Sequence, residues 1–295
     1  MSLDHLQEVL ATPGLPLCPD PIFVIGSPRS GTTALARALG THPALWTSHE
    51  SYLVHSLFGD GVIDRTWRRN VERQQAPSWL KTEQVERDEL HGFLGLGLNA
   101  LFTSRSGGRR WIDQTPLYTT MAEDLALLFP GAVFLHIVRD GRSVVHSMQH
   151  FLQKLEKRPE ARRYVPGWAS DFTEACRTWR EWTDTAAQFC EAHPTRAVTV
   201  HNEAASRDPN ASFSALYEFL GVAWAAAPIE HFARQRVNTS FVGATADPVT
   251  TSDQGQMPSW DPGRRATFLD EAGPTMVRHG LATDAELCRW ASEGR

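Results

Sequence analysis

The sequence predicts an α/β fold in a single domain, in which helices wrap a parallel sheet. Runs of apolar and β-branched residues at 22–25, 132–138 and 197–200 are typical of strands that are buried on both faces. Segments with a helical spacing of apolar residues separate these runs, and strands that alternate with helices favour a parallel sheet. No internal repeat divides residues 1–295 and no segment is interpreted as a domain linker, so we expect one domain.

Local signals predict the remaining elements in order along the chain. Residues 1–20 combine a short helical pattern with a proline-rich lead-in to the first strand. Weaker strands are expected around Trp46 and around Trp111 and Ile112. A helix is expected directly after residues 26–33, and further helices are predicted at 83–103, 117–129, 142–156, 170–192 and 208–220. The segments near 60–80 and 150–170 are polar, rich in arginine and interrupted by proline, which predicts loops or lids.

The composition narrows the class of protein. Of 295 residues, 41% are hydrophobic and 21% are charged, with a formal net charge of −5. Proteins that bind duplex DNA or an anionic membrane are usually basic over the binding surface, so neither nucleic acid nor membrane is an expected partner. The first residues lack a signal-peptide core, and the four cysteines are scattered without a CxxC pair. We therefore expect a cytoplasmic protein with reduced thiols.

The turn after the first strand is the clearest candidate site. Residues 26–33 have the sequence GSPRSGTT and join a buried strand to an apolar helix. Glycines at such a turn let backbone N–H groups approach a phosphate, and the helix N-terminus favours negative charge. Hydroxyl and guanidinium donors are available there from Arg29, Ser30, Thr32 and Thr33, with Gly26 and Gly31 framing them. The alternative is a structural turn that closes a strand.

The position of the cation in this loop distinguishes two kinds of anion. Loops that bind nucleoside triphosphates carry a lysine after the second glycine. Here Thr32 occupies that place and the cation is Arg29, three positions earlier, so the loop lacks the charge on which phosphoryl transfer from ATP relies. A kinase is therefore disfavoured, although a kinase for a small metabolite remains an alternative.

Two motifs together resemble a known family. PRSGTT follows one buried strand, and VRDGRSVVHSM, residues 138–148, follows another. This pair is similar to sulfotransferases that use 3′-phosphoadenosine 5′-phosphosulfate (PAPS), and it is closest to the tyrosylprotein and bacterial carbohydrate branch. The resemblance implies a P-loop-like sulfotransferase fold, PAPS as the sulfonate donor, 3′,5′-bisphosphoadenosine (PAP) as the product, and no metal.

The resemblance also implies roles for individual residues. Arg29 would act in catalysis and, with Ser30, Gly31, Thr32 and Thr33, would hold the 5′-phosphosulfate. Arg139 and Ser147 correspond to the pair that binds the 3′-phosphate. The alternative for Arg139 is an ion pair with Asp140 at the strand end. Arg142 is interpreted as a solvated helix residue.

The resemblance also implies a catalytic base and two further positions. A glutamate follows the loop arginine by 21 positions in the resembling branch, which corresponds to Glu50 here. His49 is the neighbouring alternative. Gln114 stands where the family often carries a lysine that meets the transition state, and the loss of that charge should lower the rate. Ser240, in Asn238-Thr239-Ser240, resembles a late motif that contacts the nucleotide.

The acceptor follows least directly from the sequence. We expect a hydroxyl on a small molecule, a glycan or a phenol, bound by acceptor-side helices and a lid in 51–110 and 150–170. Because Gln114 replaces a lysine, a catalytically weak nucleotide-binding protein is a further alternative.

Overall fold

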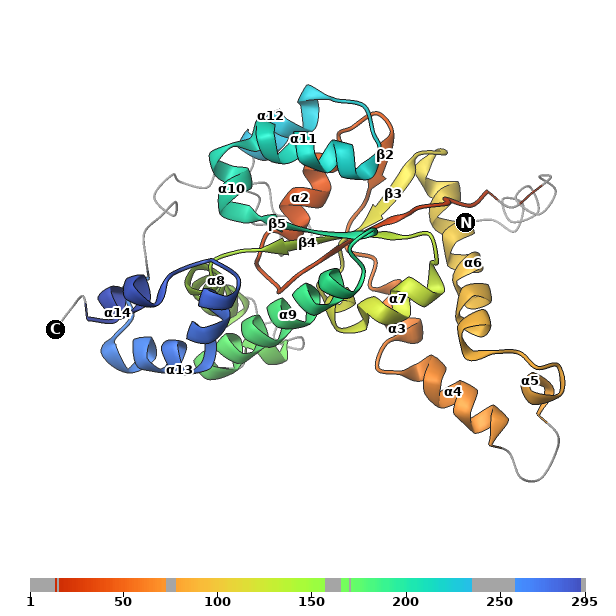
Figure 1. The fold of residues 1–295 in the computed structure, drawn as a ribbon, viewed down its shortest axis with the longest axis horizontal. Helices are drawn as coiled ribbons and strands as arrows, with labels where there is room; N and C mark the ends of the chain where they lie inside the picture. Colours follow the sequence, from red (N-terminus) through yellow and green to blue (C-terminus); the bar gives the residue numbers. More distant parts are fainter. Residues whose placement is uncertain are drawn as a thin grey trace.

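The computed structural model describes residues 14, 16–72, 78–156, 166–169, 171–234 and 258–292. Its centre is a five-stranded sheet in which every pairing is parallel, in the order β2-β3-β1-β4-β5 (Figure 1). The strands are β1 (Ile22–Ile25), β2 (Leu45–Thr47), β3 (Arg110–Asp113), β4 (Val133–Val138) and β5 (Ala197–His201). All five lie where the sequence predicts strands, and the α/β fold is confirmed.

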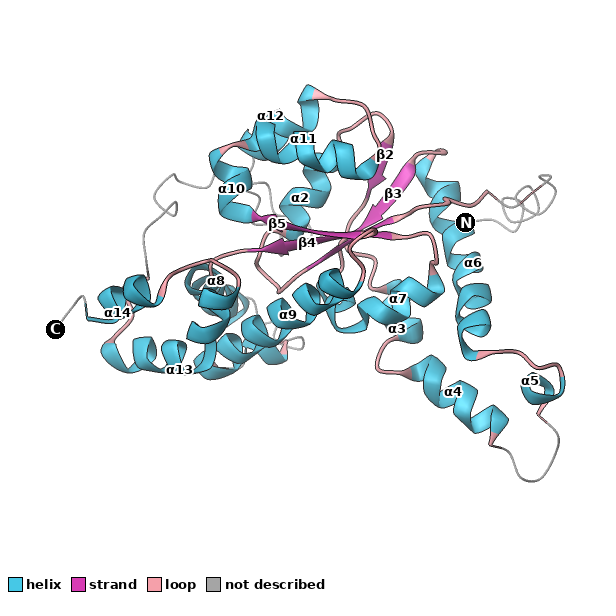
Figure 2. Ribbon diagram, viewed as in Figure 1, coloured by secondary structure: helices cyan, strands magenta, loops and turns pink. Residues whose placement is uncertain are grey.

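Helices cover both faces of this sheet, as the colouring by secondary structure shows (Figure 2). On one face lie α2 (Thr32–Leu39), α10 (Asn202–Arg207), α11 (Pro209–Leu220) and α12 (Ala226–Arg234). On the other face lie α6 (Arg87–Ser106), η1 (Pro116–Met121), α7 (Ala122–Leu128) and α9 (Phe172–Ala192). Alternation along β1 explains both layers, because Ile22 and Val24 pack into one core and Phe23 and Ile25 into the other.

A third apolar core lies beyond the end of the sheet. It is built by α8 (Gly141–Glu156), α9, α13 (Pro262–Arg278) and α14 (Asp284–Ser292), which bury Trp179, Phe268 and Met276 completely. The 3-10 turn η3 (Gly167–Ala169) lies beside α8 and α9. This core fixes α8, the helix that carries the second sequence motif.

Residues 60–80 correct the expectation of a loop. They contain α4 (Val62–Val71), which follows α3 (Leu53–Phe58), and the start of α5 (Trp79–Thr82). α4 buries Ile63, and Asp64 pairs with Arg87 of α6 at 2.6 Å, so burial and one ion pair hold a helix whose sequence is mostly polar. Of the predicted lid at 150–170, α8 extends to Glu156, whereas 157–165 and 170 lie outside the described residues, as do 1–13 and 15 of the lead-in.

Candidate functional site

The candidate site lies at the carboxyl edge of the sheet, where ligands of open α/β sheets bind. β1 occupies the middle of the sheet, with β3 on one side and β4 on the other. The loop 26–31 therefore leaves β1 between the ends of its two neighbours. The segment after β2 brings Glu50 to the same edge, and Arg139 follows β4.

Close backbone packing shapes the loop. Gly26 and Gly31 have φ values of 147° and 108°, which side chains rarely adopt. A Cβ on Gly26 would lie 2.5 Å from the carbonyl oxygen of Ile137, and one on Gly31 would lie 2.6 Å from the side-chain nitrogen of Asn202. Both glycines are therefore required where they stand.

Two residues outside the motif hold the loop in place. The hydroxyl of Thr119 accepts a hydrogen bond from the Gly26 N–H at 2.8 Å and donates one to the Gly26 carbonyl at 2.9 Å. The amide of Asn202 donates to the carbonyl of Ser30 at 3.2 Å. Arg29 has a left-handed backbone, with φ of 72°, and such a conformation persists only where its surroundings determine it.

The end of this loop has the features of an anion site. α2 begins after Gly31 with no side-chain cap and no acidic residue in its first turn, so its first N–H groups face outward from the helix end. The Ser30 hydroxyl is buried and has no hydrogen-bond partner among the described residues. A buried donor without a partner is costly, and a bound phosphate or sulfonate oxygen would satisfy it. The loop therefore fits the phosphosulfate expected from the sequence.

Cationic side chains converge on the same place. Arg29 Nε donates to Ser147 Oγ of α8 at 3.2 Å, and the Arg29 guanidinium lies 5.8 Å from the centre of the Phe151 ring. Arg139 Nη1 donates to the Arg29 carbonyl at 3.5 Å. Burial, and next the neighbouring Arg139 charge, lower the pKa of Arg29 to about 10, so it stays protonated at neutral pH. Two positive groups in one partly buried place favour an anion between them.

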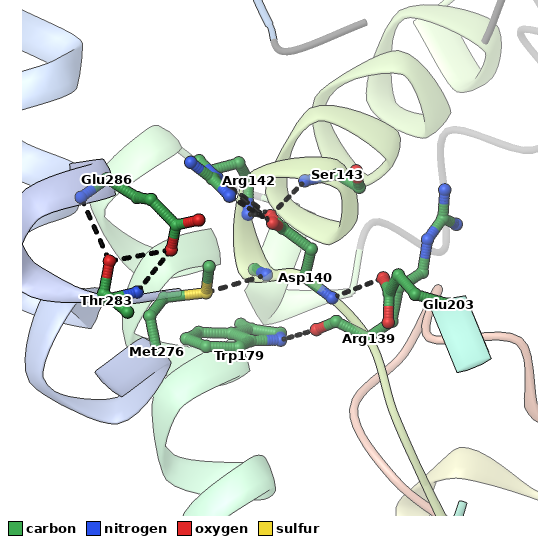
Figure 3. A network of polar contacts seen from close by, with 10 residues as sticks. Arg139, Asp140, Arg142, Ser143, Trp179, Glu203, Met276, Thr283 and Glu286 are labelled. Carbon is green, nitrogen blue, oxygen red and sulfur yellow. Dashed lines mark hydrogen bonds and ion pairs between the residues drawn. The ribbon is translucent and has the colours of Figure 1, made fainter. Parts of the chain in front are cut away.

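The backbone at Arg139 is fixed from three sides (Figure 3). Trp179 donates its indole N–H to the Arg139 carbonyl at 3.2 Å, and Glu203 accepts the next N–H, that of Asp140, at 2.9 Å. The Gly141 N–H lies 3.2 Å from the sulfur of Met276. Figure 3 shows the Arg139 side chain pointing away from Asp140. The strand end is therefore rigid while the guanidinium extends from it.

Asp140 pairs with Arg142, which corrects the interpretation of Arg142 as a solvated residue and bears on the alternative considered for Arg139. Arg142 Nη2 lies 2.5 Å from Asp140 Oδ2, and the Asp140 carboxylate also accepts from the Arg142 N–H at 2.8 Å at the start of α8. Arg142 is 4% exposed and lies over the Trp290 ring at 5.5 Å. Arg142 is thus a buried residue rather than a solvated one, and the acidic partner proposed for Arg139 is occupied by Arg142.

The candidate base lies beside the loop. Thr33 Oγ1 of α2 donates to Glu50 Oε1 at 3.5 Å, and the hydroxyl of Tyr52 donates to Glu50 Oε2 at 2.5 Å. Glu50 is half-buried, whereas the neighbouring His49 is exposed. This contact with α2 favours Glu50 over His49 as the group closest to the loop.

Gln114 is held by its own hydrogen bonds. Its Nε2 donates to the Ser48 carbonyl at 3.0 Å and its Oε1 accepts from Thr47 Oγ1 at 3.1 Å. The side chain is 1% exposed, so it ties the end of β3 to the segment that carries Glu50. Its neighbour Asp113 is 5% exposed, and burial raises the pKa of its carboxyl although Ser51, Tyr118 and Thr115 donate to it.

Ser240, and the motif around it, lies outside the described residues. Those residues contain no group of three His, Cys, Asp or Glu side chains placed to hold a metal ion. None of the described helices is long and apolar enough to cross a bilayer. Sequence reasoning missed Thr119, Asn202 and Glu203, because isolated polar residues after strands carry no motif.

Comparisons with known proteins agree with this geometry. A model described as "Sulfotransferase family" matches residues 21–226. The chain is 26% identical over 213 residues to protein-tyrosine sulfotransferase 2 of Gallus gallus, which covers 71% of this chain and 53% of that protein. Nodulation protein NoeE of Sinorhizobium fredii is 26% identical over 127 residues, or 43% of this chain and 30% of that protein. The matches to two protein-tyrosine sulfotransferases include 71% of this chain but only about half the length of those proteins.

Solved structures share the fold. The sulfotransferase domain of the Synechococcus PCC 7002 olefin synthase superposes with a TM-score of 0.51 at 20% identity, covering 87% of this chain and 95% of that one. Mouse sulfotransferase SULT7A1, complexed with PAP, gives a TM-score of 0.50 at 14% identity, covering 92% and 88%. Because the family model matches residues 21–226, which include the loop and the second motif, the chain belongs to the sulfotransferase family.

Proposed function

We propose that this protein transfers a sulfonate group from PAPS to an acceptor hydroxyl. The observation that carries the proposal is the contact of Arg29 with Ser147, because it brings the phosphate loop and the second motif into one site. The match to the sulfotransferase family supports the same activity.

The nucleotide would be held at both of its phosphate ends. Arg139 and Ser147 lie at the end of β4 and on α8, where their guanidinium and hydroxyl groups would bind the 3′-phosphate. The loop donors of Arg29, Ser30, Gly31, Thr32 and Thr33 would bind the 5′ end. Arginine suits both places because its planar fork of N–H groups matches phosphate geometry and stays charged.

The chain's own residues divide the chemistry between them. When bound, PAPS supplies an activated sulfonate with a phosphate leaving group. Glu50 would accept the proton of the acceptor hydroxyl. Its carboxylate already accepts a hydrogen bond from one hydroxyl, that of Tyr52. Arg29 would offset the charge that develops on the leaving phosphate oxygen. Gln114 carries no charge, and its amide is hydrogen-bonded to Ser48 and Thr47. We therefore expect a lower rate of transfer than a lysine at this position would give.

The acceptor hydroxyl would belong to a small molecule, a glycan or a phenol. The relatives named protein-tyrosine sulfotransferases support a phenolic hydroxyl among these. A cytoplasmic location, which the sequence indicates, stays a prediction and would favour a small phenol over a secreted protein.

Ligand-dependent thermal unfolding tests the nucleotide assignment. A ligand at about 100 times its dissociation constant adds roughly 2.7 kcal/mol to stability, which is readily measured. PAP should raise the melting temperature, whereas AMP, which lacks the 3′-phosphate, should raise it far less. A shift with magnesium and ATP but not with PAP would support a small-metabolite kinase instead.

Transfer is then tested with PAPS and a panel of phenols, sugars and aliphatic alcohols. Sulfated product from at least one phenol is the expected result. Tight PAP binding without transfer to any acceptor would support the catalytically weak nucleotide-binding protein and contradict the proposed activity.

A further inference from the structure

Tyr52 places a phenolic hydroxyl on the candidate base. Its hydroxyl donates to Glu50 Oε2 at 2.5 Å, while the other oxygen of that carboxylate accepts from Thr33 of the loop helix. A general base must lie within hydrogen-bond reach of the proton that it removes. The hydroxyl of Tyr52 lies within this reach of Glu50, so the chain itself supplies a hydroxyl where an acceptor hydroxyl would have to lie.

The backbone around Tyr52 holds the phenol there against a conformational preference. Tyr52 has a left-handed backbone with φ of 52°, and its N–H donates to Thr115 Oγ1 at 3.2 Å. The preceding Ser51 donates to the buried Asp113 at 2.5 Å. Such a conformation persists only where several contacts determine it. The segment after β2 is therefore built to direct this side chain.

Burial does not explain the position of the Tyr52 ring. Tyr52 is 46% exposed, whereas Tyr118 and Tyr217 are 0% and 3% exposed and fill the two cores beside the sheet. The chain has four tyrosines, and the remaining one, Tyr164, lies outside the described residues. Partial desolvation of the half-exposed Tyr52 side chain, and next its hydrogen bond to the Glu50 carboxylate, raise the pKa of Tyr52, so its hydroxyl stays protonated and needs a base to react.

We propose that Tyr52 is itself a sulfonate acceptor, modified in cis by the site that it lines. In this step the phenolic oxygen bonds to the sulfur of PAPS, and the bond from sulfur to the 5′-phosphate oxygen breaks. The phenolic proton moves to Glu50, and PAP leaves. The proposal rests on the proposed sulfotransferase function, and it adds a modification site on the chain.

The test incubates the full chain with radiolabelled PAPS and no added acceptor. Label should appear on the peptide that contains residue 52, with the mass gain of one SO₃ group. Tyr52→Phe should abolish this label, and Glu50→Gln should slow it by about 10²- to 10⁴-fold, the typical range for loss of a general base, while PAP binding is retained. Tyr217→Phe is the matched control and should label normally, because its hydroxyl contacts only the Ala225 carbonyl among the described residues.

The kinetics separate reaction within one chain from reaction between chains. A labelling rate per chain that is independent of protein concentration supports modification in cis, and a rate that rises with concentration overturns it. Label on Tyr164 or elsewhere instead of Tyr52 also overturns the inference. An unlabelled Tyr52 in a protein that sulfates an added phenol overturns the inference and leaves the proposed function standing, whereas failure of both PAP binding and transfer removes both.

Discussion

Arg29 Nε donates a hydrogen bond to Ser147 Oγ at 3.2 Å, and these residues lie 118 positions apart in the sequence. Arg29 belongs to the loop after β1, and Ser147 lies on α8 after β4. Because β1 and β4 are adjacent and parallel, their carboxyl ends bring the two segments to one edge. Two sequence motifs, each of which could be structural by itself, therefore form one site.

Arg139→Ala should weaken PAP binding and leave AMP binding almost unchanged. A hydrogen bond to a charged group contributes about 1.5–3 kcal/mol, so the loss in PAP affinity should be roughly 10- to 100-fold. Isothermal titration calorimetry with both nucleotides measures the difference. Arg69→Ala, on an exposed part of α4, is the matched control for loss of one positive charge. Equal losses for PAP and AMP would contradict a role at the 3′-phosphate.

Glu50→Gln should lower turnover and spare PAP affinity. The variant keeps the size of the side chain and an oxygen that can accept from Tyr52, but it cannot take up a proton. General-base catalysis contributes about 10²- to 10⁴-fold, so kcat should fall in that range. The exposed neighbour His49→Gln serves as the control and should retain turnover. Normal kcat in Glu50→Gln, or a large loss in His49→Gln, would move the base to another residue.

Much of the site was predictable from sequence because its parts are contiguous. The loop at residues 26–33 occupies consecutive positions between a strand and a helix, so its residue types and their context indicated its place in the fold, while its anionic ligand stays a proposal. The second motif starts at Val138, the last residue of β4, which is the strand that pairs with β1. Strands β1, β4 and β5 were predictable because a strand buried on both faces is a run of apolar residues, whereas β2 and β3 contain polar residues and gave weaker signals.

The supporting residues were not predictable because they act across the fold. Thr119 contacts Gly26 from 93 positions away, and Asn202 contacts Ser30 from 172 positions away. Arg142 carries a charge, which suggests a solvated residue, yet α14 brings Trp290 over its guanidinium. The polar helix α4 was missed because its contact with Arg87 of α6 is set by tertiary packing.

Gly31→Ala should destabilise the protein and weaken PAP binding together. The added Cβ would lie 2.6 Å from the side-chain nitrogen of Asn202, and residue 31 has a φ of 108°, which alanine rarely adopts. The loop must therefore shift or keep a strained backbone, at a cost of about 1–3 kcal/mol in stability. Gly97→Ala in α6 is the control, because a Cβ there meets nothing within 4 Å and alanine favours a helix by up to about 1 kcal/mol. Urea unfolding should therefore show opposite changes in stability. Unchanged stability and PAP affinity in Gly31→Ala would contradict the close packing of this loop.

His136 should make the protein less stable as the pH falls. It lies in β4, is 1% exposed, and accepts or donates one hydrogen bond with Thr199 at 3.2 Å. Burial, with smaller contributions from His279 and His201, lowers the pKa of His136 from 6.5 to about 3. Below pH 6.5 the unfolded chain binds a proton at His136 that the folded chain does not bind. The free energy of unfolding therefore falls by about 1.4 kcal/mol for each unit by which the pH is lowered, down to about pH 3.

Urea unfolding at a series of pH values measures this slope, and His136→Asn removes the titrating group. As the pH falls from 6.5 to about 4, the free energy of unfolding of the variant should fall less steeply than that of the parent chain. The two slopes should differ by about 1.4 kcal/mol per pH unit, because asparagine takes up no proton in either state. Asp113, with its raised pKa, acts in the opposite direction in both proteins, so it cancels in the comparison. Parallel pH profiles for the parent and His136→Asn would show that His136 becomes protonated in the folded protein, which would require the β4–β5 contact to open in acid.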